Sequence, residues 1–439
     1  MQIQYQKALS NLGITSLNPM QETADKTIVS KDEIVLIAPT GSGKTIAFLF
    51  PLLKLLDASV QSVQCLILVP SRELALQIEQ VWKKMGTGLK VNVCYGGHDA
   101  RIEAKNLTIP PVLLIGTPGR IADHIHRGRI SLDAIKTLVL DEFDKSLELG
   151  FKDEMKFILD GLNNLTKKVL VSATESLNIP EFVNVNAPFT LNFATPEKET
   201  IPDLTMRAVI SEDRDKLQTL FQLLCSLNSE PALIFCNHRD ACERASTFLN
   251  DLGVVTTFYH GGMEQNDRER ALVQFRNGSV NYLVTTDLAA RGLDIPEMKH
   301  VIHFQLPPHE NEFTHRNGRT ARMNAKGTAY LLMSKQEKQP DYISSKLKEL
   351  ILSQKKQLPL PPLFQTLYIN GGKKTKLNKF DIVGSFLQKG KLNKDDLGLI
   401  EVQDFNSFVA VKTNKVAALL NSIKEEKIKG KKYKIGVAS

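Results

Sequence analysis

The segment Ala38–Thr45 has the composition of a phosphate-binding loop. It reads APTGSGKT, follows the apolar run EIVLI and precedes the apolar stretch IAFLFPLLKLL. In such a loop, backbone N–H groups surround the phosphates, a lysine neutralises the β- and γ-oxygens, and a Ser or Thr hydroxyl binds Mg²⁺. The general motif begins with glycine, where this chain has alanine, but the GSGKT core favours a nucleotide site over an ordinary strand–turn–helix connection. We therefore predict that nucleotide is bound by Ala38, Pro39, Thr40, Gly41, Ser42, Gly43, Lys44 and Thr45.

A second segment suited to chemistry is the acidic run DEFD, Asp141 to Asp144, which follows the apolar residues TLVL. A carboxylate at a strand end can reach the Mg²⁺ of a phosphate loop, and its neighbour can orient and deprotonate a water for in-line attack. Strand ends are often acidic, so the run alone is weak support. Together with the phosphate loop it predicts nucleotide hydrolysis, with Thr45 and Asp141 as metal ligands.

The surrounding pattern predicts that both segments belong to a parallel sheet. Over residues 1–195, short apolar runs such as EIVLIAP, VQCLILVP and TLVLDE alternate with longer amphipathic stretches. Continuous apolar strands separated by helices indicate a parallel sheet covered on both faces, with ligands at the carboxyl ends of its strands. A second series, from PALIFCN to GTAYLLM, falls in residues 205–350. The polar segment 194–204 is the predicted linker between them.

The end of the chain follows a different pattern. A charged stretch after Ser334, expected to be helical, ends at the proline cluster Pro359–Pro362, a second predicted linker. Residues 362–439 then read strand, helix, strand, strand, helix, strand, which is the order of a split ferredoxin-like domain. The predicted fold class is α/β, with two tandem parallel-sheet domains followed by a small ferredoxin-like βαββαβ domain.

The excess positive charge is confined to this last segment. Residues 361–439 contain 15 Lys, no Arg and 7 acidic residues, which accounts for the whole formal net charge of +8. One interpretation is a soluble lysine-rich tail. The other is a small domain that binds phosphates, because lysine contacts to phosphate release counterions.

The remaining composition excludes several classes of protein. Hydrophobic content of 42% and charged content of 24% are those of a folded globular chain. No apolar run reaches the roughly 18 residues of a membrane span, and the start MQIQYQKALS lacks the pattern of an export or transit signal. Five cysteines without a CxxC pair indicate reduced thiols, and the scattered histidines indicate no structural metal. We expect a cytoplasmic protein that does not enter a membrane.

Over residues 10–350 the ordered motifs resemble those of the DEAD-box ATP-dependent RNA helicases. The first domain contains NPMQ, APTGSGKT, PSRELALQ, GG, TPGR, DEFD and SAT, and the second contains LIFCN, QxxR, TTDLAARGLDIP and HRNGRTAR. Because these motifs occur in the family's order and at plausible spacing, the chain is identified as a member. The resemblance implies two RecA-like domains, ATP and Mg²⁺ as ligands, RNA as the partner, and RNA-stimulated ATP hydrolysis.

The resemblance also implies roles for single residues. Gln21 matches the glutamine that reads the adenine edge, and Asp294 matches a residue that contacts the ribose. Asp141 would hold Mg²⁺ through water, and Glu142 would activate the attacking water. The implied catalytic residues are Lys44, Asp141, Glu142 and the two arginines that reach the γ-phosphate, Arg319 and Arg322, while Ser172 and Thr174 would couple hydrolysis to strand separation. The family's RNA-backbone contacts fall on Arg72, Gly97, Thr117, Arg120, Arg268, Thr286 and Arg291.

Three features depart from the family's pattern. Phe143 stands where the family usually has Ala, so its benzyl group either alters coupling to Ser172 and Thr174 or is absorbed by local repacking. In the last motif, Asn and Ala at positions 317 and 321 replace the usual Ile and Gly. Tyr5 is the nearest aromatic upstream of Gln21, but it lies too close to serve as the residue that stacks on adenine. Weaker adenine affinity than the family's norm is expected.

The C-terminal segment resembles the RNA-binding domain of the DbpA-like branch of bacterial DEAD-box proteins, through GKLNKDDLGLIEV, FVAVKT and KIKGKKYKI. The implied fold is RRM-like, without the aromatic RNP1 pattern. Phe405 and Phe408 flank that place, and the alternation in FNSFVAV favours core positions over base stacking for them. RNA contact is instead expected from Lys373, Lys374, Lys376, Lys429, Lys431, Lys432 and Lys434. The branch implies a target in large-subunit ribosomal RNA, and hence pre-ribosomal particles as partners.

The predicted function is that of a monomeric ATP-dependent RNA helicase that opens short RNA duplexes locally during ribosome assembly. One alternative is an ATP-gated RNA clamp or scaffold, in which Phe143 has slowed hydrolysis almost to nothing. A second alternative is a DNA helicase, against which the family's 2′-hydroxyl contacts argue.

Overall fold

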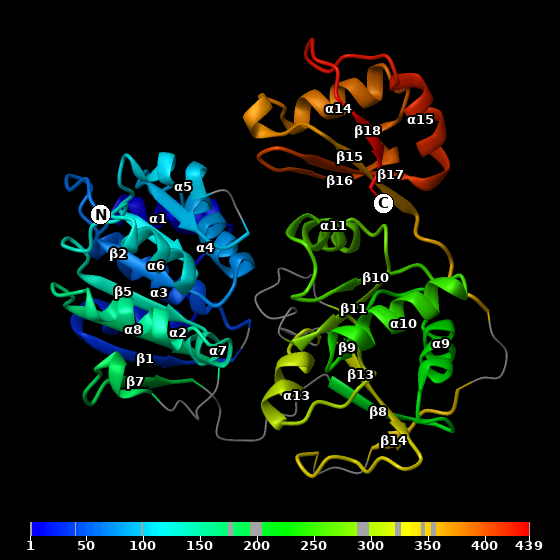
Figure 1. The fold of residues 1–439 in the computed structure, drawn as a ribbon, viewed down its shortest axis with the longest axis horizontal. Helices are drawn as coiled ribbons and strands as arrows, with labels where there is room; N and C mark the ends of the chain where they lie inside the picture. The colour runs from blue at the N-terminus through cyan, green and yellow to red at the C-terminus, as the bar shows by residue number, and fades with distance from the viewer. Residues whose placement is uncertain are drawn as a thin grey trace. The chain divides into compact units, whose positions relative to one another are not determined.

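The computed structural model describes residues 2–39, 41–97, 100–173, 179–193, 204–287, 298–320, 326–343, 347–352 and 357–438. Backbone contacts divide the chain into two compact units, with the division near residue 200. The first unit contains one sheet and the second contains two (Figure 1). Among the described residues, no helix has the length and apolar character needed to cross a membrane.

The first unit is a parallel seven-stranded sheet with helices on both faces (Figure 1). Its strands lie in the order β3-β4-β2-β5-β6-β1-β7, and the neighbouring pairs are parallel. The strands are β1 (Glu33–Ile37), β2 (Cys65–Leu68), β3 (Val91–Cys94), β4 (Leu113–Gly116), β5 (Thr137–Asp141), β6 (Lys167–Ser172) and β7 (Phe189–Asn192). The helices are α1 (Gln2–Leu12), α2 (Pro19–Ser30), α3 (Lys44–Leu55), α4 (Arg72–Met85), α5 (Ala100–Leu107), α6 (Pro118–His126), α7 (Phe143–Glu148), α8 (Lys152–Asp160) and the 3₁₀ turn η1 (Glu181–Val183).

Strand β1 shows why its sequence is apolar at every position after Glu33. Ile34 and Leu36 join one apolar core, and Val35 and Ile37 join another. Successive side chains of a strand point to opposite faces, so a strand covered on both faces is apolar throughout. This burial fixes the sheet and leaves the polar residues at the carboxyl ends of the strands to form a site.

The second unit begins with another parallel seven-stranded sheet, in the order β10-β11-β9-β12-β13-β8-β14. Its strands are β8 (Leu204–Ser211), β9 (Ala232–Cys236), β10 (Thr256–Tyr259), β11 (Tyr282–Thr286), β12 (His300–His303), β13 (Gly327–Ser334) and β14 (Lys348–Glu349). The described helices are α9 (Leu217–Ser226), α10 (Arg239–Asp251), α11 (Gln265–Arg276) and α13 (Glu310–Asn317).

The helix predicted after residue 334 is wrong for the described residues of that stretch. They contain instead the short edge strand β14, which pairs with β8. Leu350 and Leu352 pack against the core of the second sheet, whereas Ile351 between them is 87% exposed. This alternation has the period of an extended chain, and Pro340 is unsuited to a helix interior.

The C-terminal sheet is antiparallel and has the order β16-β17-β15-β18. Its elements are β15 (Phe364–Ile369), η2 (Lys373–Thr375), α14 (Lys379–Gln388), η3 (Lys394–Asp396), β16 (Leu397–Val402), β17 (Ser407–Lys412), η4 (Thr413–Lys415), α15 (Val416–Ile423) and β18 (Ile435–Val437). Helices α14 and α15 lie on one face of the sheet (Figure 1). The predicted βαββαβ order is therefore present, with the last strand starting at Ile435.

The other face of the C-terminal sheet contacts α11 of the same unit. Phe408 on β17 is 3% exposed and clusters with Val273 of α11 and with Ala438. Polar contacts join Gln274 Nε2 to the Ala438 carbonyl (2.6 Å), Ser279 Oγ to Thr366 Oγ1 (2.7 Å), and Arg276 to Glu401 (3.3 Å).

Phe405 and Phe408, both predicted to be core residues, differ in their burial. Val409 and Val411 join the core of the C-terminal domain, so Phe408 points to the opposite face and is buried there by α11. Phe405 is 48% exposed in the turn before β17, so its predicted core position is wrong. The alternation that we read from Phe405 begins only at Ser407, where the strand starts.

Candidate functional sites

The phosphate-loop residues lie between the carboxyl end of β1 and the start of α3. Gly41 and Gly43 have φ values of +85° and +89°, a conformation that glycine adopts without strain. Lys44 opens α3, and its ammonium donates to the carbonyls of Ala38 (2.5 Å) and Pro39 (2.9 Å). The predicted residues 38, 39 and 41–45 are thus brought together, and Thr45 follows Lys44 in the first turn of the helix.

Gln21 touches this loop directly. Asn18 and Gln21 form a capping box at the start of α2, in which each side chain accepts the other's backbone N–H. The two amides also donate to the loop, from Gln21 Nε2 to the Gly43 carbonyl (3.2 Å) and from Asn18 Nδ2 to the Ser42 carbonyl (3.1 Å). A Cβ at Gly43 would lie 2.3 Å from Gln21 Nε2. Asn18 is a site residue that sequence reasoning missed, although it opens the NPMQ motif.

Lys44 and the acidic run form one electrostatic group. Burial raises the pKa of Asp141 to about 7, the Glu142 carboxylate also raises it, and the Lys44 ammonium opposes them. Burial lowers the pKa of Lys44, while Asp141, Glu142 and Asp144 favour its charged form. Glu142 has a φ of +47°, and its N–H donates to Asp141 Oδ1 (3.0 Å). A backbone held in this sparsely populated region is often found at functional sites.

Ser172 ends β6, beside the end of β5. Asp141 on β5 is in register with Val171 on β6, and Ser172 in turn is in register with Ile37 on β1. Ser172 is fully buried and lies between the acidic run and the phosphate loop in the sheet. Its predicted role in coupling stays a prediction.

Phe143 points away from these polar groups. Its side chain is 1% exposed and belongs to the apolar core that includes Leu140, Met155 and Leu170. Of the two outcomes expected for this departure, the structure has the ring absorbed by packing. Tyr5 likewise packs on the edge of Phe50, with ring centroids 4.8 Å apart, under the ammonium of Lys54.

The RNA-contact residues predicted in the first domain gather around Tyr95, which sequence reasoning missed. Tyr95 follows β3, and its ring lies 4.6 Å from the Arg72 guanidinium. Its carbonyl accepts from Arg120 Nε (3.2 Å), and Gly97 follows two residues later with a φ of +78°. Thr117 caps α6, and its N–H donates to the Cys94 carbonyl (3.0 Å). Because β3, β4 and β2 are adjacent, these residues share one sheet edge.

In the second domain, Arg268 and Thr286 lie at neighbouring strand ends. Arg268 Nη2 donates to the Tyr259 hydroxyl (3.0 Å), and its guanidinium lies over the Tyr259 ring. Tyr259 pairs with Thr285 across β10 and β11, so the next residue, Thr286, lies on the same edge. Arg319 is 7% exposed and follows α13. Asn317 accepts from His303 Nε2 (3.0 Å), which gives the polar replacement in this motif a buried partner.

Arg316 was not singled out from the sequence, yet it joins three motifs of the second domain. Its fully buried guanidinium makes a bidentate pair with Asp287, at 2.6 and 2.5 Å. It also donates to Asn237 Oδ1 (2.7 Å) and to the Gln305 carbonyl (2.6 Å). Its place in the motif HRNGRTAR was the available signal.

Five predicted site residues lie outside the described residues: Thr40, Thr174, Arg291, Asp294 and Arg322.

The lysines predicted to bind RNA fall on two adjoining segments of the C-terminal domain. Lys429 Nζ donates to the Lys376 carbonyl (3.3 Å), and Asn370 exchanges two hydrogen bonds with the backbone of Lys434. Both segments lie at the end of the sheet where β15 ends and β18 begins. We call this end, with Lys373, Lys374, Lys376, Lys429, Lys431, Lys432 and Lys434, the lysine end.

The folds and the residues at their strand ends define an enzyme class, the nucleotide-dependent proteins with two RecA-like domains. Family comparisons agree: residues 18–182 match the DEAD/DEAH box helicase family, 215–324 the helicase conserved C-terminal domain, and 366–437 the DbpA RNA binding domain. The chain is 32% identical to the ATP-dependent RNA helicase DbpA of Escherichia coli, over 97% of this chain and 95% of that one. It is 30% identical to DbpA of Bacillus subtilis, over 99% and 97%.

Solved structures give the same result for the two parallel-sheet domains. Dbp5 of S. cerevisiae bound to RNA and ADP BeF3 is 26% identical, with a TM-score of 0.65 over 76% of this chain and 88% of that one. Mss116p bound to ssRNA and AMP-PNP is 27% identical, with a TM-score of 0.66 over 76% and 72%. The chain belongs to the DEAD-box ATP-dependent RNA helicases of the DbpA type, which bind ATP and RNA and carry a dedicated RNA-binding domain.

Proposed function

We propose that this helicase uses ATP hydrolysis to open short RNA duplexes locally, on large-subunit ribosomal RNA in pre-ribosomal particles. The observation that carries the proposal is the combination, in one chain, of a hydrolytic nucleotide site with a separate lysine end. The first supplies free energy from ATP, and the second holds an RNA by its phosphates. The similarity to ATP-dependent RNA helicases supports RNA-dependent ATP hydrolysis as the general activity. The proposed ribosomal target rests on the DbpA-type RNA-binding domain.

At the nucleotide site we assign each residue a task. Gln21 selects adenine, Lys44 neutralises the β- and γ-phosphates, and Glu142 orients and deprotonates the attacking water. The Glu142 backbone N–H donates to Asp141 Oδ1, which helps to hold the Asp141 carboxylate in place. Arg319 and Arg322 are proposed partners of the γ-phosphate, and Asp294 of the ribose. Ser172 and Thr174 are proposed to transmit hydrolysis to the RNA.

The residues present fit Mg²⁺. This ion prefers a few oxygen ligands from the protein and keeps several waters. Thr45 offers a hydroxyl, and Asp141 offers a buried carboxylate whose charge a cation would compensate. We propose that these two would hold Mg²⁺, directly or through water, and that the bound ion would supply charge neutralisation at the phosphates.

RNA is proposed to lie along the strand-end edges that carry Arg72, Gly97, Thr117 and Arg120 in one domain and Arg268, Thr286 and Arg291 in the other. Backbone contacts of this kind give affinity without reading sequence. The lysine end would then select where on a large RNA the enzyme acts. We propose domain limits of 1–195, 205–350 and 362–439, a monomer, and action in the cytoplasm.

The two alternatives receive no structural support of their own. The clamp was based on Phe143, whose ring is absorbed in the core. The DNA helicase is tested by replacing RNA with DNA strands of the same sequence in the assay below.

The test is steady-state ATP hydrolysis without RNA, with poly-RNA and with ribosomal RNA, beside Glu142→Gln. We expect stimulation by RNA, larger with ribosomal RNA, and loss of about 10²–10⁴-fold in the variant because general-base catalysis is removed. Asp160→Asn, which neutralises an exposed carboxylate of the same domain, serves as the control and should match the parent.

Duplex opening is measured separately, as release of a labelled strand from a short RNA duplex joined to a ribosomal RNA fragment. Release that requires ATP and Glu142 supports the proposal. Tight ATP-dependent RNA binding with negligible turnover would establish the clamp instead, and equal stimulation by DNA would remove the preference for RNA.

A further inference from the structure

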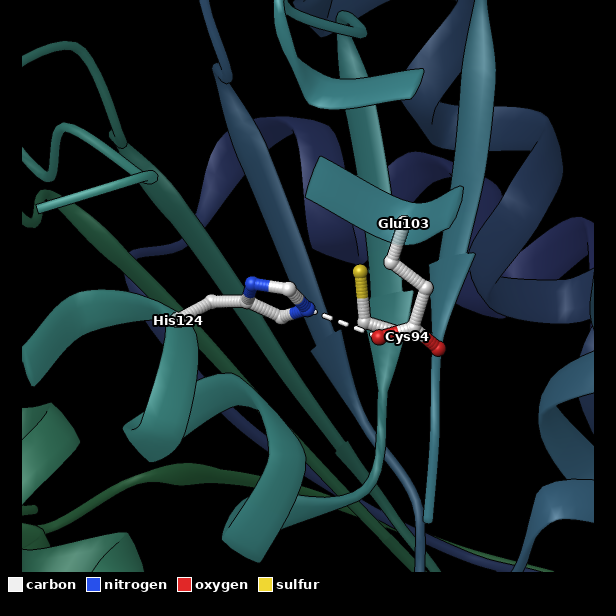
Figure 2. Close-up of side chains that lie close together, drawn as sticks. All are labelled: Cys94, Glu103 and His124. Atoms are coloured by element: carbon white, nitrogen blue, oxygen red, sulfur yellow. Dashed lines mark hydrogen bonds and ion pairs between the residues drawn. The ribbon is translucent and has the colours of Figure 1, made fainter. Parts of the chain in front are cut away.

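Behind the edge that carries Arg72 and Arg120 lies a buried cluster of three side chains, Cys94, Glu103 and His124 (Figure 2). Cys94 ends β3, Glu103 lies on α5 and His124 lies on α6. One donor atom from each falls within 4.8 Å of the others. Figure 2 shows the Glu103 carboxylate pointing to the His124 ring, with the bond of 2.7 Å between His124 Nε2 and Glu103 Oε2.

The carboxylate of Glu103 is already engaged at both oxygens. Oε1 accepts the Tyr95 N–H (3.1 Å), and Oε2 faces both His124 Nε2 (2.7 Å) and Arg120 Nε (3.5 Å). A dication seated at Oε2 would therefore meet the Arg120 guanidinium. Burial also raises the pKa of the Cys94 thiol, which disfavours the thiolate that a metal requires. These contacts argue for a role in organising Arg120 rather than in binding a metal.

The hydrogen bond between His124 Nε2 and Glu103 Oε2 helps to hold the Glu103 carboxylate in place. An ionised carboxylate only accepts hydrogen bonds, so His124 Nε2 must be the donor. Within the described residues, His124 Nδ1 has no hydrogen-bond partner, so the ring's polar contact is the one with Glu103. A buried carboxylate needs such compensation, and the Arg120 cation and the His124 N–H supply it.

Tyr95 links the cluster to a second arginine. Its N–H donates to Glu103, its carbonyl accepts from Arg120 Nε, and its ring lies 4.6 Å from the Arg72 guanidinium. Glu103 thus restrains the backbone of the residue on which Arg72 rests and also the side chain of Arg120. Both contacts of Arg120 described here use Nε, the nitrogen nearest the chain, which sets the direction of the guanidinium fork.

We infer that Glu103, held by His124, is a positioning residue for RNA binding: it orients Arg120 toward the RNA backbone and, through Tyr95, supports Arg72. This inference rests on the proposed RNA contact of Arg120 and goes beyond it by naming the buried group on which that contact depends. Glu103 itself touches no RNA, since its side chain is 3% exposed.

The sharpest variant is Glu103→Gln. The amide oxygen still accepts the Tyr95 N–H, and the amide nitrogen replaces Oε2. His124 can change tautomer and accept from that nitrogen, whereas Arg120 Nε, which only donates, loses the Glu103 carboxylate and keeps the Tyr95 carbonyl. The variant therefore isolates the arginine contact with little change in volume.

We would measure the oligoadenylate concentration that half-saturates ATP hydrolysis for the parent, Glu103→Gln, Arg120→Ala and the double variant. Each single substitution is expected to raise this concentration roughly tenfold, the size of a charge-assisted contact. The double variant should be no worse than Arg120→Ala, because Glu103→Gln keeps the bond to Tyr95 and removes only the contact with Arg120. In Glu103→Gln the turnover at saturating RNA and the KM for ATP should stay at parent values, with Asp160→Asn as the neutral control.

Separate outcomes overturn separate claims. If the double variant raises the half-saturating RNA concentration about hundredfold, the product of the two single effects, then the two residues act independently and the positioning role is overturned. An unchanged RNA requirement in Arg120→Ala overturns the RNA contact itself and with it this part of the proposed function. One zinc per chain in the purified parent, absent from Glu103→Gln, would show a metal site in place of a positioning residue. Melting curves that match the parent exclude unfolding as the cause.

Discussion

Asp141 is a carboxyl group whose protonation is altered by its surroundings. Burial and the neighbouring Glu142 raise its pKa to about 7, so in the nucleotide-free enzyme it is partly protonated at neutral pH. Metal binding requires the ionised form, so binding Mg·ADP should release its proton. We expect the release to approach one proton at pH 6 and to vanish by about pH 8, with affinity rising over that range and levelling off above it.

Calorimetry in buffers of different ionisation enthalpy measures this release directly. The nucleotide's own phosphate contributes equally to the parent and to Asp141→Asn, so the difference between them reports Asp141. Equal proton release by both proteins at pH 6 would mean that Asp141 is already ionised in the free enzyme.

Phe143 is the residue at which this chain departs from the acidic motif of its family. Because its ring is fully buried, Phe143→Ala should leave a cavity and lower the free energy of unfolding of the first domain by about 3–5 kcal/mol. Trp82, the single tryptophan of the chain, is buried in this domain and reports its unfolding in urea. The matched control is Phe157→Ala, at a side chain 37% exposed, which should cost far less. An increase in the saturated ATPase rate of Phe143→Ala would instead favour the clamp interpretation.

At the scale of elements, the apolar runs predicted β1 to β6 of the first sheet and β9 to β13 of the second, because strands buried on both faces are largely apolar. The runs did not predict β7, β8 and β14, which lie at or beside a sheet edge. The same physics explains what was missed. Position 408 alternates with core residues, and the pattern alone could not show that α11, far away in the chain, covers the opposite face. Tyr95 and Glu103 lie near predicted motifs, but their joint role depends on β3, α5 and α6 meeting in space. The stretch after residue 334 is rich in helix-forming residues. As an extended chain, however, it packs both Leu350 and Leu352 against the core of the second sheet, and this burial outweighs the helix propensity.

The contact of α11 with the C-terminal sheet makes its own prediction. Phe408→Asp leaves the core of the C-terminal domain intact, because Phe408 points to the other face, but places a charge against Val273. We expect the contact to lose about 2–3 kcal/mol from the buried aromatic group alone. Protease cleavage in the exposed linker near residues 358–363 should then accelerate in the full chain.

Phe405→Asp is the matched control, since that ring is 48% exposed and lies in the turn before the same strand. Its cleavage rate should equal that of the parent. Equal rates for both variants would show that the contact contributes little in solution.

At the scale of the whole molecule, charge is distributed unevenly along the chain. The last 79 residues, 361–439, carry the net charge of +8, and the positive and negative charges of the remaining residues cancel. The lysine end concentrates part of it where β15 ends and β18 begins. If these lysines contact phosphates, replacing Lys373, Lys374, Lys431 and Lys432 by Gln should weaken RNA binding and flatten its dependence on salt. Four lost contacts to single-stranded RNA correspond to a change of about 3 in the slope of log K against log salt.

The control is a second set of four lysines at the opposite end of the same sheet, Lys391, Lys394, Lys412 and Lys415, also replaced by Gln. Both variants lose the same charge, so a general electrostatic attraction would change both slopes equally. A contact confined to the lysine end changes only the first. Loss of preference for ribosomal RNA with both slopes unchanged would mean that the domain recognises the shape of its RNA and not its phosphates, and that the lysine excess serves another purpose.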